Sequence, residues 1–336
     1  MKVAVFSAKP HDLRFLDAAN AGQHELHYLP ERLSPATARL AKGASAACLF
    51  ANDRADAAAI QQLASAGVRL IALRSAGFNN VDLEAARARD IIVCRVPAYS
   101  PEAVAEHTFA LLLALIRKVH VAHCRIRGGY FSLDGLLGFN LAGKTIGIVG
   151  VGNIGSVVAR IARGFGCTVL GSDPYPRADA DVRYCSLDEL LHVSDVVTLH
   201  CPLESNTRHL IDEQALRRMK QGAILVNTSR GAVVDTPAVL EALKDGHLGG
   251  VAFDVYEYED ALFFEDHSSE SIHDELFVRL LSFPNALVTG HQGFFTVEAL
   301  TNIAKTTIEN ISAFERTGVP VHVVPGSTPV SAVEIA

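Results

Sequence analysis

The 336-residue sequence lacks any apolar run long enough to cross a lipid bilayer. Its longest obvious run, Phe109 to Ile116, has eight residues, whereas a membrane-spanning helix needs about 20. The apolar run nearest the start, Val3 to Phe6, is shorter than the core of about 7–15 residues in a secretory signal peptide. We therefore expect a cytoplasmic protein without a membrane partner.

Paired cysteines and clusters of basic residues are also missing. The six cysteines include no CxxC pair, so disulfides and a structural zinc site are not expected, and the scattered thiols suit a reducing compartment. The 30 Lys and Arg residues are outnumbered by 37 Asp and Glu, which gives a formal net charge of −7. Without a basic surface, nucleic acid is not an expected partner.

What the chain does contain is enough apolar material for packed interiors. Hydrophobic residues make up 49% and charged residues 20% of the sequence, which is typical of a globular protein. The length favours two domains of about 100–200 residues each.

Short β-branched apolar stretches alternate with segments of helical period in two parts of the chain, which predicts parallel sheets covered by helices. In the first part, strands are expected within residues 2–6, 24–29, 47–50, 69–73 and 91–94. In the second, they are expected within residues 145–150, 167–173, 195–200, 223–228, 250–254 and 286–290.

Two longer helices are expected at the joins between these parts. Residues 100–123 have helical spacing, with Ser100 as a candidate N-cap and Pro101 at the first helical position. The segment after Thr296 is also helical in period and stops at Gly318. The first would link the two domains, and the second would return the chain to the first domain.

A glycine-rich loop indicates a dinucleotide site. In "TIGIVGVGNIG", Gly150, Gly152 and Gly155 have the G-x-G-x-x-G spacing after a predicted strand and at the start of a predicted helix. These glycines permit a tight turn, close approach to a pyrophosphate and close helix–strand packing, with the phosphates at the positive end of the helix. The alternative is a glycine-rich turn without a ligand.

The next predicted strand ends at Asp173, eighteen residues after Gly155 (173 − 155). A carboxylate about 20 residues on can accept hydrogen bonds from the adenosine ribose and would repel the extra phosphate of NADP. Together the two features favour NAD as the cofactor, although nearby Arg177 could soften that preference.

Several segments in one order along the chain resemble the D-2-hydroxyacid dehydrogenase family, and most closely its fermentative D-lactate dehydrogenases. They are "SAGFNNVDLEAA", "VPAYSPEAVAEHTFALLLALIRK", "GIVGVGNIG", "LHCPLESNTRHLI", "LVNTSRGAVVD", "AFDVYEYED" and "VTGHQGFFTVEAL". Small departures are "TGHQ" where many relatives have "TPH", and Cys201 before Pro202.

The resemblance implies a fold class and an assembly. A Rossmann-type doubly wound parallel sheet, residues 101–298, would be inserted into a flavodoxin-like substrate domain made of residues 1–100 and 299–336. The resemblance also implies a homodimer or homotetramer.

The family's catalytic residues fall on Arg230, Glu259 and His291. Each follows a predicted strand, which would bring all three to the carboxyl end of one sheet. Reduction of a 2-keto acid needs a proton donor, and His291 suits that role. Glu259 would orient the imidazole and stabilise its protonated form, while Arg230 would bind the substrate carboxylate and polarise the carbonyl. Each residue taken alone also fits a structural role.

The resemblance carries over further contacts to NAD and to the substrate. For NAD they are Gly150, Gly152, Asn153, Ile154, Gly155, Asp173, Cys201, Pro202, Asn206, Thr228, Ser229, Arg230 and Asp254. For the substrate they are backbone N–H groups of Ala76 and Gly77, and the side chains of Tyr99, Arg230, His291 and Phe294.

Residues 254–267 contain six acidic side chains. Apart from Asp254 and Glu259, we expect them to form the solvated face of a loop, Glu257 among them. No metal site is expected there, because the spacing of His267 and His273 fits no standard ligand pattern.

The predicted function is an NAD-dependent D-lactate dehydrogenase that interconverts pyruvate and D-lactate. Two alternatives stay open. The first is a dehydrogenase for another D-2-hydroxy acid such as glycerate, 2-hydroxyisocaproate or a phosphorylated acid, for which Arg74 would be the nearby cation. The second is a non-catalytic NAD(H)-sensing protein on the same fold.

Overall fold

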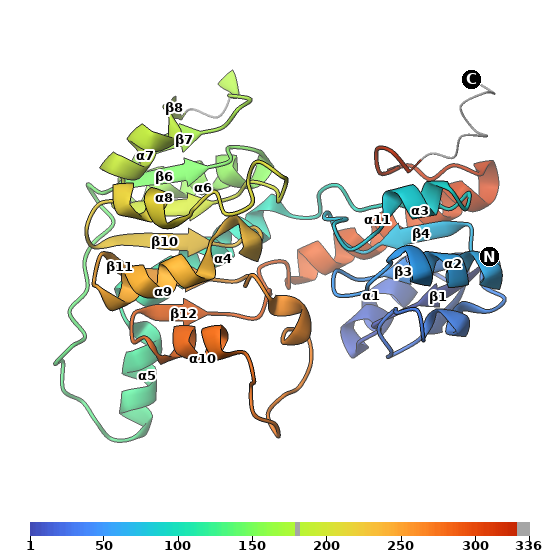
Figure 1. Cartoon of the computed structure of the whole chain (residues 1–336), viewed down its shortest axis with the longest axis horizontal. Helices are drawn as coiled ribbons and strands as arrows, with labels where there is room; N and C mark the ends of the chain where they lie inside the picture. Colours follow the sequence, from blue (N-terminus) through green and yellow to red (C-terminus); the bar gives the residue numbers. More distant parts are fainter. Residues whose placement is uncertain (179–181, 328–336) are drawn as a thin grey trace. The chain divides into compact units, whose positions relative to one another are not determined.

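The computed structural model describes residues 1–178 and 182–327, and the chain folds into two compact units (Figure 1). Unit 1 consists of Met1–Ser100 with Phe295–Ala336, and unit 2 of Pro101–Phe294. The expected inserted domain ends at residue 298, whereas in the structure the chain returns to unit 1 after Phe294. The last helix, which belongs to unit 1, has its N-cap at Thr296. Residues 328–336, the end of the expected segment 299–336, lie outside the described residues.

Unit 1 is built on a parallel sheet with the order β2-β1-β3-β4-β5, which is the flavodoxin-like order. Its strands are β1 (Lys2–Val5), β2 (Glu25–Tyr28), β3 (Ala46–Leu49), β4 (Leu70–Leu73) and β5 (Ile92–Cys94). Its helices are α1 (Pro10–Asn20), the 3-10 helix η1 (Ala38–Ala41), α2 (Ala57–Ala66), α3 (Leu83–Arg87) and α11 (Val297–Thr317).

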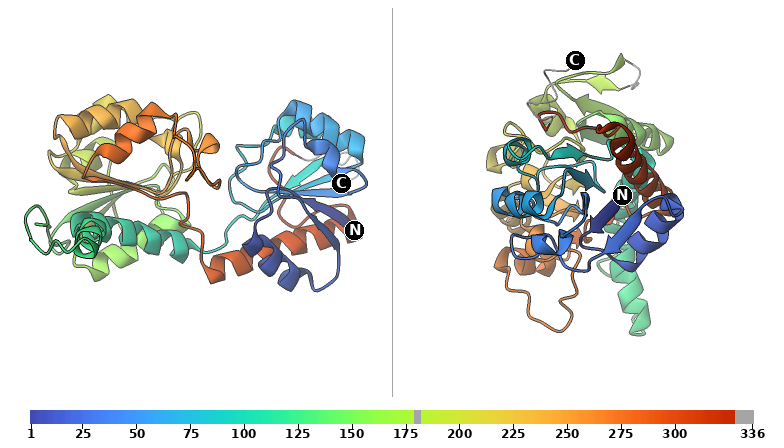
Figure 2. Two further views of the ribbon diagram at one scale, coloured as in Figure 1. Left: turned by 90° about the horizontal axis from the view of Figure 1, so that it is seen from below. Right: turned by 90° about the vertical axis from the view of Figure 1, so that its right-hand side faces the viewer.

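Helices cover both faces of this sheet (Figure 2). Successive side chains of a strand point to opposite faces, and accordingly Val3 packs in a core cluster with Ile308 of α11, whereas Ala4 packs with Ile60 of α2. Both faces of the sheet are therefore buried against helices, which explains why its strands consist of short continuous apolar runs.

Unit 2 contains a parallel sheet with more strands, in the order β12-β11-β10-β9-β6-β7-β8. Its strands are β6 (Thr145–Val149), β7 (Thr168–Ser172), β8 (Arg183–Tyr184), β9 (Val196–Leu199), β10 (Ala223–Asn227), β11 (Leu248–Phe253) and β12 (Ala286–Val288). Its helices are α4 (Pro101–Ile116), α5 (Val119–Arg127), α6 (Asn153–Gly164), α7 (Leu187–Val193), α8 (Glu213–Arg218), η3 (Gly231–Val233), α9 (Thr236–Lys244), η4 (Glu259–Ala261) and α10 (Glu275–Ser282).

The strand order of unit 2 reverses between β6 and β9, as in a doubly wound dinucleotide-binding fold. Ile148 of β6 packs in a cluster with Leu112 of α4 and Val158 of α6, and Val149 packs in another with Leu216 of α8 and Leu240 of α9. The expected Rossmann-type and flavodoxin-like sheets are thus confirmed. The loops after β6, β7, β9, β10, β11 and β12 all leave the carboxyl edge of one parallel sheet, where ligands of this fold bind.

Two local expectations about unit 2 are wrong. The continuous helix expected over residues 100–123 is divided into α4 and α5, because Lys118 has a positive φ of 52°. Strand β8 was not expected, since a two-residue strand carries no apolar pattern. By contrast, α11 begins after its N-cap Thr296 and ends at Gly318, whose φ is 78°, as expected.

Within residues 1–178 and 182–327, no helix is both long and apolar enough to span a membrane. Within the same ranges, no group of three or more His, Cys, Asp or Glu side chains is arranged to hold a metal ion.

Candidate active site

The glycine-rich loop joins β6 to α6 and can be built only with glycine at two of its positions. Gly150 has a φ of 89°, and a Cβ there would lie 2.7 Å from the backbone nitrogen of Cys201. A Cβ on Gly155 would lie 2.1 Å from the carbonyl oxygen of Gly150. At Gly152 nothing lies within 4 Å of the Cβ position, so the backbone has open space beside the start of α6. Such a cradle, at a helix N-terminus, fits the pyrophosphate of NAD.

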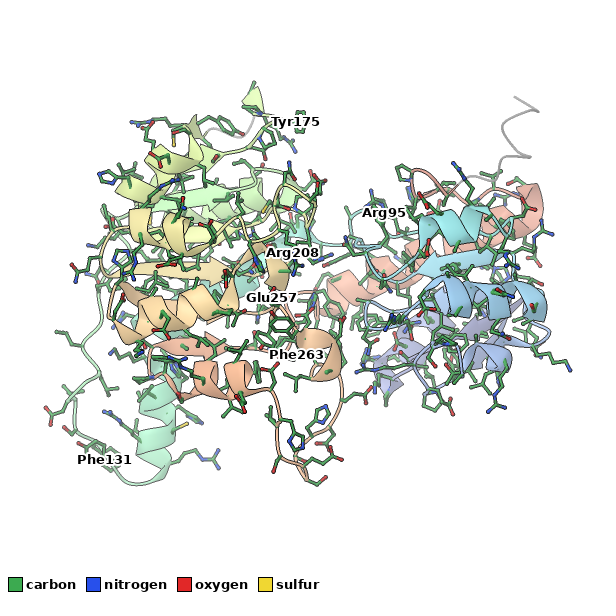
Figure 3. All side chains as sticks on the ribbon, viewed as in Figure 1. Arg95, Phe131, Tyr175, Arg208, Glu257 and Phe263 are labelled. Atoms are coloured by element: carbon green, nitrogen blue, oxygen red, sulfur yellow. The ribbon has the colours of Figure 1, made fainter. Side chains whose placement is uncertain are left out.

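Asp173 follows β7, and the loop backbone holds its carboxylate in place. One oxygen accepts a hydrogen bond from Val151 N at 2.7 Å and the other from Tyr175 N at 2.8 Å (Tyr175 is labelled in Figure 3). Each carboxylate oxygen keeps a further lone pair, so this position fits a carboxylate that accepts from ribose hydroxyls. The Arg177 guanidinium donates to Asn153 Oδ1 at 3.1 Å, across the start of α6.

The loop after β9 lies against the glycine-rich loop through buried, neutral groups. Burial lowers the pKa of His200 to about 3, and its Nε2 lies 2.9 Å from Thr198 Oγ1. Burial also raises the pKa of the Cys201 thiol to about 11. Cys201, the departure from the family pattern, is therefore a small uncharged contact beside Gly150. Asn206 and Pro202 are exposed on the turn that follows.

Arg230 lies at the end of the loop that follows β10, and Asn227 shapes that loop. Asn227 Oδ1 accepts from the backbone nitrogen and the hydroxyl of Ser229, at 3.0 and 2.8 Å, and Asn227 Nδ2 donates to Arg230 O at 2.9 Å. The Thr228 hydroxyl is buried 2.9 Å from that of Thr108. The Arg230 guanidinium donates to Ser229 O at 2.7 Å through one nitrogen, Nη1.

His291 and Glu259 form a hydrogen-bonded pair between the loops after β12 and β11. His291 Nδ1 lies 2.7 Å from Glu259 Oε1, and the second carboxylate oxygen accepts from Tyr256 N at 2.9 Å. The two side chains are 21% and 18% exposed. Because the carboxylate accepts the hydrogen on Nδ1, the imidazole keeps Nε2 for other chemistry. The expected meeting of these two residues is therefore present in the structure.

Asp254, at the end of β11, anchors the His291 loop from inside. Its side chain is 2% exposed and accepts from Thr289 Oγ1 at 2.5 Å, Gln292 N at 2.9 Å and Gly293 N at 2.7 Å. His107 Nε2 of α4 lies 3.2 Å away. Burial by itself would raise the pKa of Asp254, but the hydrogen bonds from His107, Thr289 and Gln292 outweigh it and lower the pKa.

Asp254 also fixes the backbone of the proton-donor candidate. His291 N donates to Asp254 O at 2.6 Å, and His291 has a φ of 52°, a conformation that a non-glycine residue keeps only when its surroundings determine it. Contact of Asp254 with the cofactor stays a prediction. The support from His107 was not anticipated, because that residue lies 147 positions away in the sequence.

The prediction that Glu257 is a solvated surface residue is wrong. Its side chain is 2% exposed and lies 2.6 Å from His209 Nε2. The loop that carries it is also less polar than its acidic residues indicate. Tyr256, Phe263 and Phe277 form a small apolar cluster beneath it, and the Tyr256 hydroxyl donates to Asp274 at 2.9 Å. The aromatic pair in "ALFFED" was the sequence signal for this cluster.

The other substrate candidates lie mainly in unit 1. Ala76 and Gly77 follow β4, where Ala76 O accepts from Arg95 Nη1 at 3.0 Å and Gly77 O accepts from the Ser75 hydroxyl at 2.8 Å. Tyr99 follows β5, and its carbonyl accepts from Asn302 Nδ2 at 2.7 Å. Phe294 is the last residue of unit 2.

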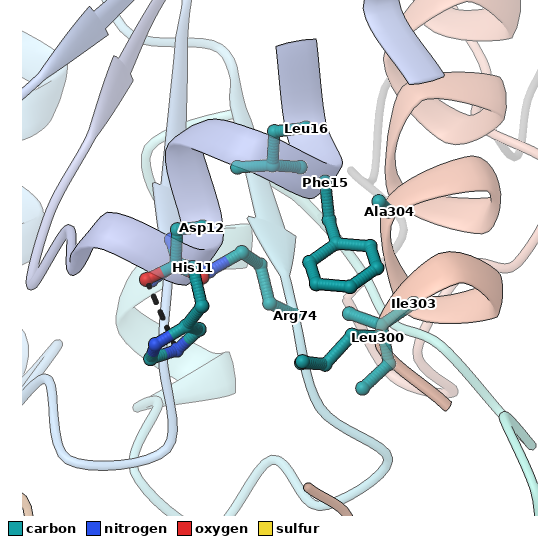
Figure 4. Close-up of a pocket in the computed structure, with 8 residues that line it drawn as sticks. All are labelled: His11, Asp12, Phe15, Leu16, Arg74, Leu300, Ile303 and Ala304. Atoms are coloured by element: carbon teal, nitrogen blue, oxygen red, sulfur yellow. Dashed lines mark ion pairs between the residues drawn. The ribbon is translucent and has the colours of Figure 1, made fainter. Parts of the chain in front are cut away.

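Arg74 lines a small pocket in unit 1, beside α1 and α11 (Figure 4). Its side chain is 2% exposed, pairs with Asp12 at 3.2 Å and donates to the carbonyl oxygens of Phe6 at 3.1 Å and Cys48 at 3.3 Å. A guanidinium held in this way is a structural cation, so Arg74 is poorly suited to bind a substrate phosphate.

Comparison with known proteins agrees with this geometry. The family model described as "D-isomer specific 2-hydroxyacid dehydrogenase, NAD binding domain" matches residues 109–293. The 2-hydroxyacid dehydrogenase A of Aspergillus oryzae is 51% identical over 320 residues, which cover 94% of this chain and 92% of that protein. The D-lactate dehydrogenase of Escherichia coli is 47% identical over 320 residues, which cover 94% of this chain and 97% of that protein.

A solved structure gives the same result for the fold. The apo-structure of D-lactate dehydrogenase from Escherichia coli matches with a TM-score of 0.87 at 44% identity, and the match covers 96% of this chain and 100% of that chain. With its two parallel-sheet units, its glycine-rich loop and its relatives across almost the full length, the chain belongs to the D-isomer specific 2-hydroxyacid dehydrogenase family and is an NAD-dependent enzyme.

Proposed function

We propose that the protein is a D-lactate dehydrogenase that reduces pyruvate to D-lactate and works in reverse when lactate and NAD are abundant. Bound NADH supplies the hydride that adds to the carbonyl carbon, and the protein supplies the proton that adds to the carbonyl oxygen. The match to the D-lactate dehydrogenase of Escherichia coli supports this substrate.

His291 is the proposed proton donor. The hydrogen bond from Nδ1 to Glu259 directs the opposite nitrogen, Nε2, away from the carboxylate and makes it available to a substrate oxygen. Glu259 in turn stabilises the imidazolium by its negative charge at 2.7 Å. In lactate oxidation the neutral imidazole accepts the proton from the substrate hydroxyl, so each direction needs the opposite protonation state.

Arg230 is proposed to bind the substrate carboxylate and to stabilise negative charge on the carbonyl oxygen. Its planar guanidinium matches a carboxylate with two parallel hydrogen bonds, and only Nη1 donates to Ser229 O. A lysine at this position would lose the bidentate geometry.

The residues around the glycine-rich loop are proposed to hold NAD. The cradle beside Gly152 would take the pyrophosphate, and the carboxylate of Asp173 would accept from the adenosine ribose. The remaining proposed contacts are Asn153, Ile154, Cys201, Pro202, Asn206, Thr228, Ser229 and Asp254. In unit 1, Ala76, Gly77 and Tyr99 remain proposed substrate contacts, as does Phe294 in unit 2.

The single observation that supports the enzymatic function most directly is the His291–Glu259 pair at the carboxyl edge of an NAD-binding sheet. A spectrophotometric assay of NADH consumption against a panel of 2-keto acids tests it. Pyruvate should give the highest kcat/KM. A preference for hydroxypyruvate or 2-ketoisocaproate would make the protein a sister dehydrogenase, and no turnover on any acid would favour an NAD(H)-sensing protein.

A homodimer or homotetramer is proposed for the assembly. Helix α5 buries none of its residues, and the segment after it exposes Phe131, Leu133 (81%) and Leu137 (90%). Phe131 is labelled in Figure 3. Arg125 Nη1 donates to Asp134 O at 2.6 Å, so this apolar segment has internal structure. Contiguous exposed apolar side chains mark interaction sites. Leu137→Asp should therefore lower the mass measured by sedimentation, whereas Val321→Asp, at an exposed site in unit 1, should not.

A further inference from the structure

Glu257 lies two residues before Glu259 and connects three loops through one buried carboxylate. Its Oε1 lies 2.6 Å from His209 Nε2 and 3.3 Å from Arg208 Nη2, and its Oε2 accepts from Thr236 N at 3.5 Å. Figure 3 labels Arg208 and Glu257 in unit 2. A carboxylate that is 2% exposed is stable only when such donors compensate its lost hydration.

The backbones around this carboxylate are packed as closely as atoms allow. A Cβ on Gly231 would lie 2.1 Å from the carbonyl carbon of Tyr256 and 2.4 Å from Glu257 N. The loop that carries Arg230 therefore lies directly on the loop that carries Glu259. Neither loop can shift without moving the other.

A third segment is fastened to the same place. His209 N donates to Ala232 O at 2.8 Å, and Ile211 N donates to Val233 O at 3.1 Å. His209 has a φ of 50°, a conformation that a histidine keeps only when surrounding contacts determine it. The bond from its ring to Glu257 is one of those contacts.

Just before His209, the chain forms the turn proposed to contact NAD. The Thr207 hydroxyl accepts from Glu204 N and donates to Pro202 O, both at 2.7 Å, which holds residues 202–207 together as one turn. This turn continues directly into Arg208 and His209. The position of the turn relative to the Arg230 and Glu259 loops thus depends on what holds the side chains of Arg208 and His209.

We propose that Glu257 is a positioning residue which, through His209 and Arg208, fixes the NAD-contacting turn against the loops of Arg230 and Glu259. Its loss would weaken NADH binding and misplace the catalytic side chains at the same time. The inference rests on the proposed cofactor contacts at residues 202–206, and extends them to a residue that is not among the proposed contacts of cofactor or substrate.

The test compares Glu257→Ala, Glu257→Gln and His209→Gln with wild type. The NADH dissociation constant is measured by NADH fluorescence without any 2-keto acid, so a wrong substrate assignment cannot affect it. The value of kcat is measured in the steady state with NADH and the 2-keto acid both saturating. Circular dichroism gives the folded fraction, by which all values are corrected. His209→Gln changes a partly exposed side chain and serves if Glu257→Ala fails to fold.

Glu257→Ala should weaken NADH binding at least tenfold and lower kcat at least tenfold. Glu257→Gln should recover part of the NADH affinity and part of kcat, since its amide oxygen still accepts a hydrogen bond. The double variant Glu257→Gln, His209→Gln should be no more impaired than the more impaired of the two single variants. The matched control is Glu270→Gln, which alters an exposed Glu paired with His267 at 3.7 Å in the same loop. NADH binding and kcat within twofold of wild type in His209→Gln and in the folded Glu257 variants, or equal losses in the control, would overturn the proposal.

Discussion

Replacement of Glu259 by Gln should slow pyruvate reduction. The change keeps the size of the side chain and removes the charge that lies 2.7 Å from His291 Nδ1. A hydrogen bond to a charged group contributes about 1.5–3 kcal/mol. The pair is about one fifth exposed, with 21% and 18% for the two side chains, so we use the lower part of that range.

Since about 1.4 kcal/mol corresponds to a factor of ten in rate, the loss of about 1.5 kcal/mol of stabilisation from the proton-donor pair predicts a fall in kcat/KM of about tenfold. The rate should fall because an imidazole that the carboxylate no longer holds and orients donates its proton less readily to the carbonyl oxygen. The assay is kcat/KM for pyruvate at one fixed pH, followed by NADH consumption.

Glu270→Gln, in the same loop and largely exposed, is the control and should leave kcat/KM unchanged. A Glu259→Gln variant with the kcat/KM of wild type would show that this carboxylate does not assist the imidazole during the reaction. The proposed division of roles between the two residues would then be incorrect.

Three further changes test other parts of the site. His291→Gln should lower kcat by about 10²–10⁴-fold, the usual contribution of a general acid, with NADH affinity within a few-fold of wild type; equal losses in both would indicate a folding or cofactor defect instead. The pKa of Asp254 is lowered in the folded protein, so its carboxylate stabilises the fold at pH values above the ordinary pKa of Asp, near 4. That stabilisation is lost as the pH falls through the lowered pKa of the folded state. Urea unfolding of Asp254→Asn should therefore show less stability at neutral pH and a weaker loss on acidification, and an unchanged acid response would count against the anchoring role. Gly155→Ala places a Cβ 2.1 Å from Gly150 O and should weaken NADH binding strongly, whereas Gly222→Ala, at another glycine of the fold but with nothing within 4 Å of the Cβ position, should affect stability only through its φ of 81°.

The parts of the fold that the sequence predicts correctly are those with local signals. Helix α11 begins after its N-cap Thr296, whose hydroxyl accepts from Ala299 N, and it ends at Gly318, which has a positive φ. Both signals are properties of the residue types themselves. The strands were recognisable because β-branched residues in a doubly covered parallel sheet form continuous apolar runs. Lys118, in contrast, is a good helix former, so no local propensity predicts the end of α4 beside it.

The candidate site shows the same division. The glycine spacing around Gly150 and the polar residues at strand ends were visible in the sequence, because the fold requires those residue types there. The burial of Glu257 was not visible, since its partners Arg208 and His209 lie 49 and 48 positions away. Composition alone indicated solvent exposure for a residue in an acidic stretch, and only the folded chain supplies the donors that allow it to be buried.

Gly231 has a consequence for how this enzyme could diversify. Any side chain at this position would force apart two backbones that touch. Natural variation or laboratory evolution therefore cannot adjust the loop of Arg230 and the loop of Glu259 independently. New substrate preferences should instead arise from exchanges around the proposed substrate contacts of unit 1, Ala76, Gly77 and Tyr99, where altered side chains would leave the apparatus for proton transfer intact. A library confined to those loops should therefore yield active variants far more often than one of equal size centred on residues 228–233.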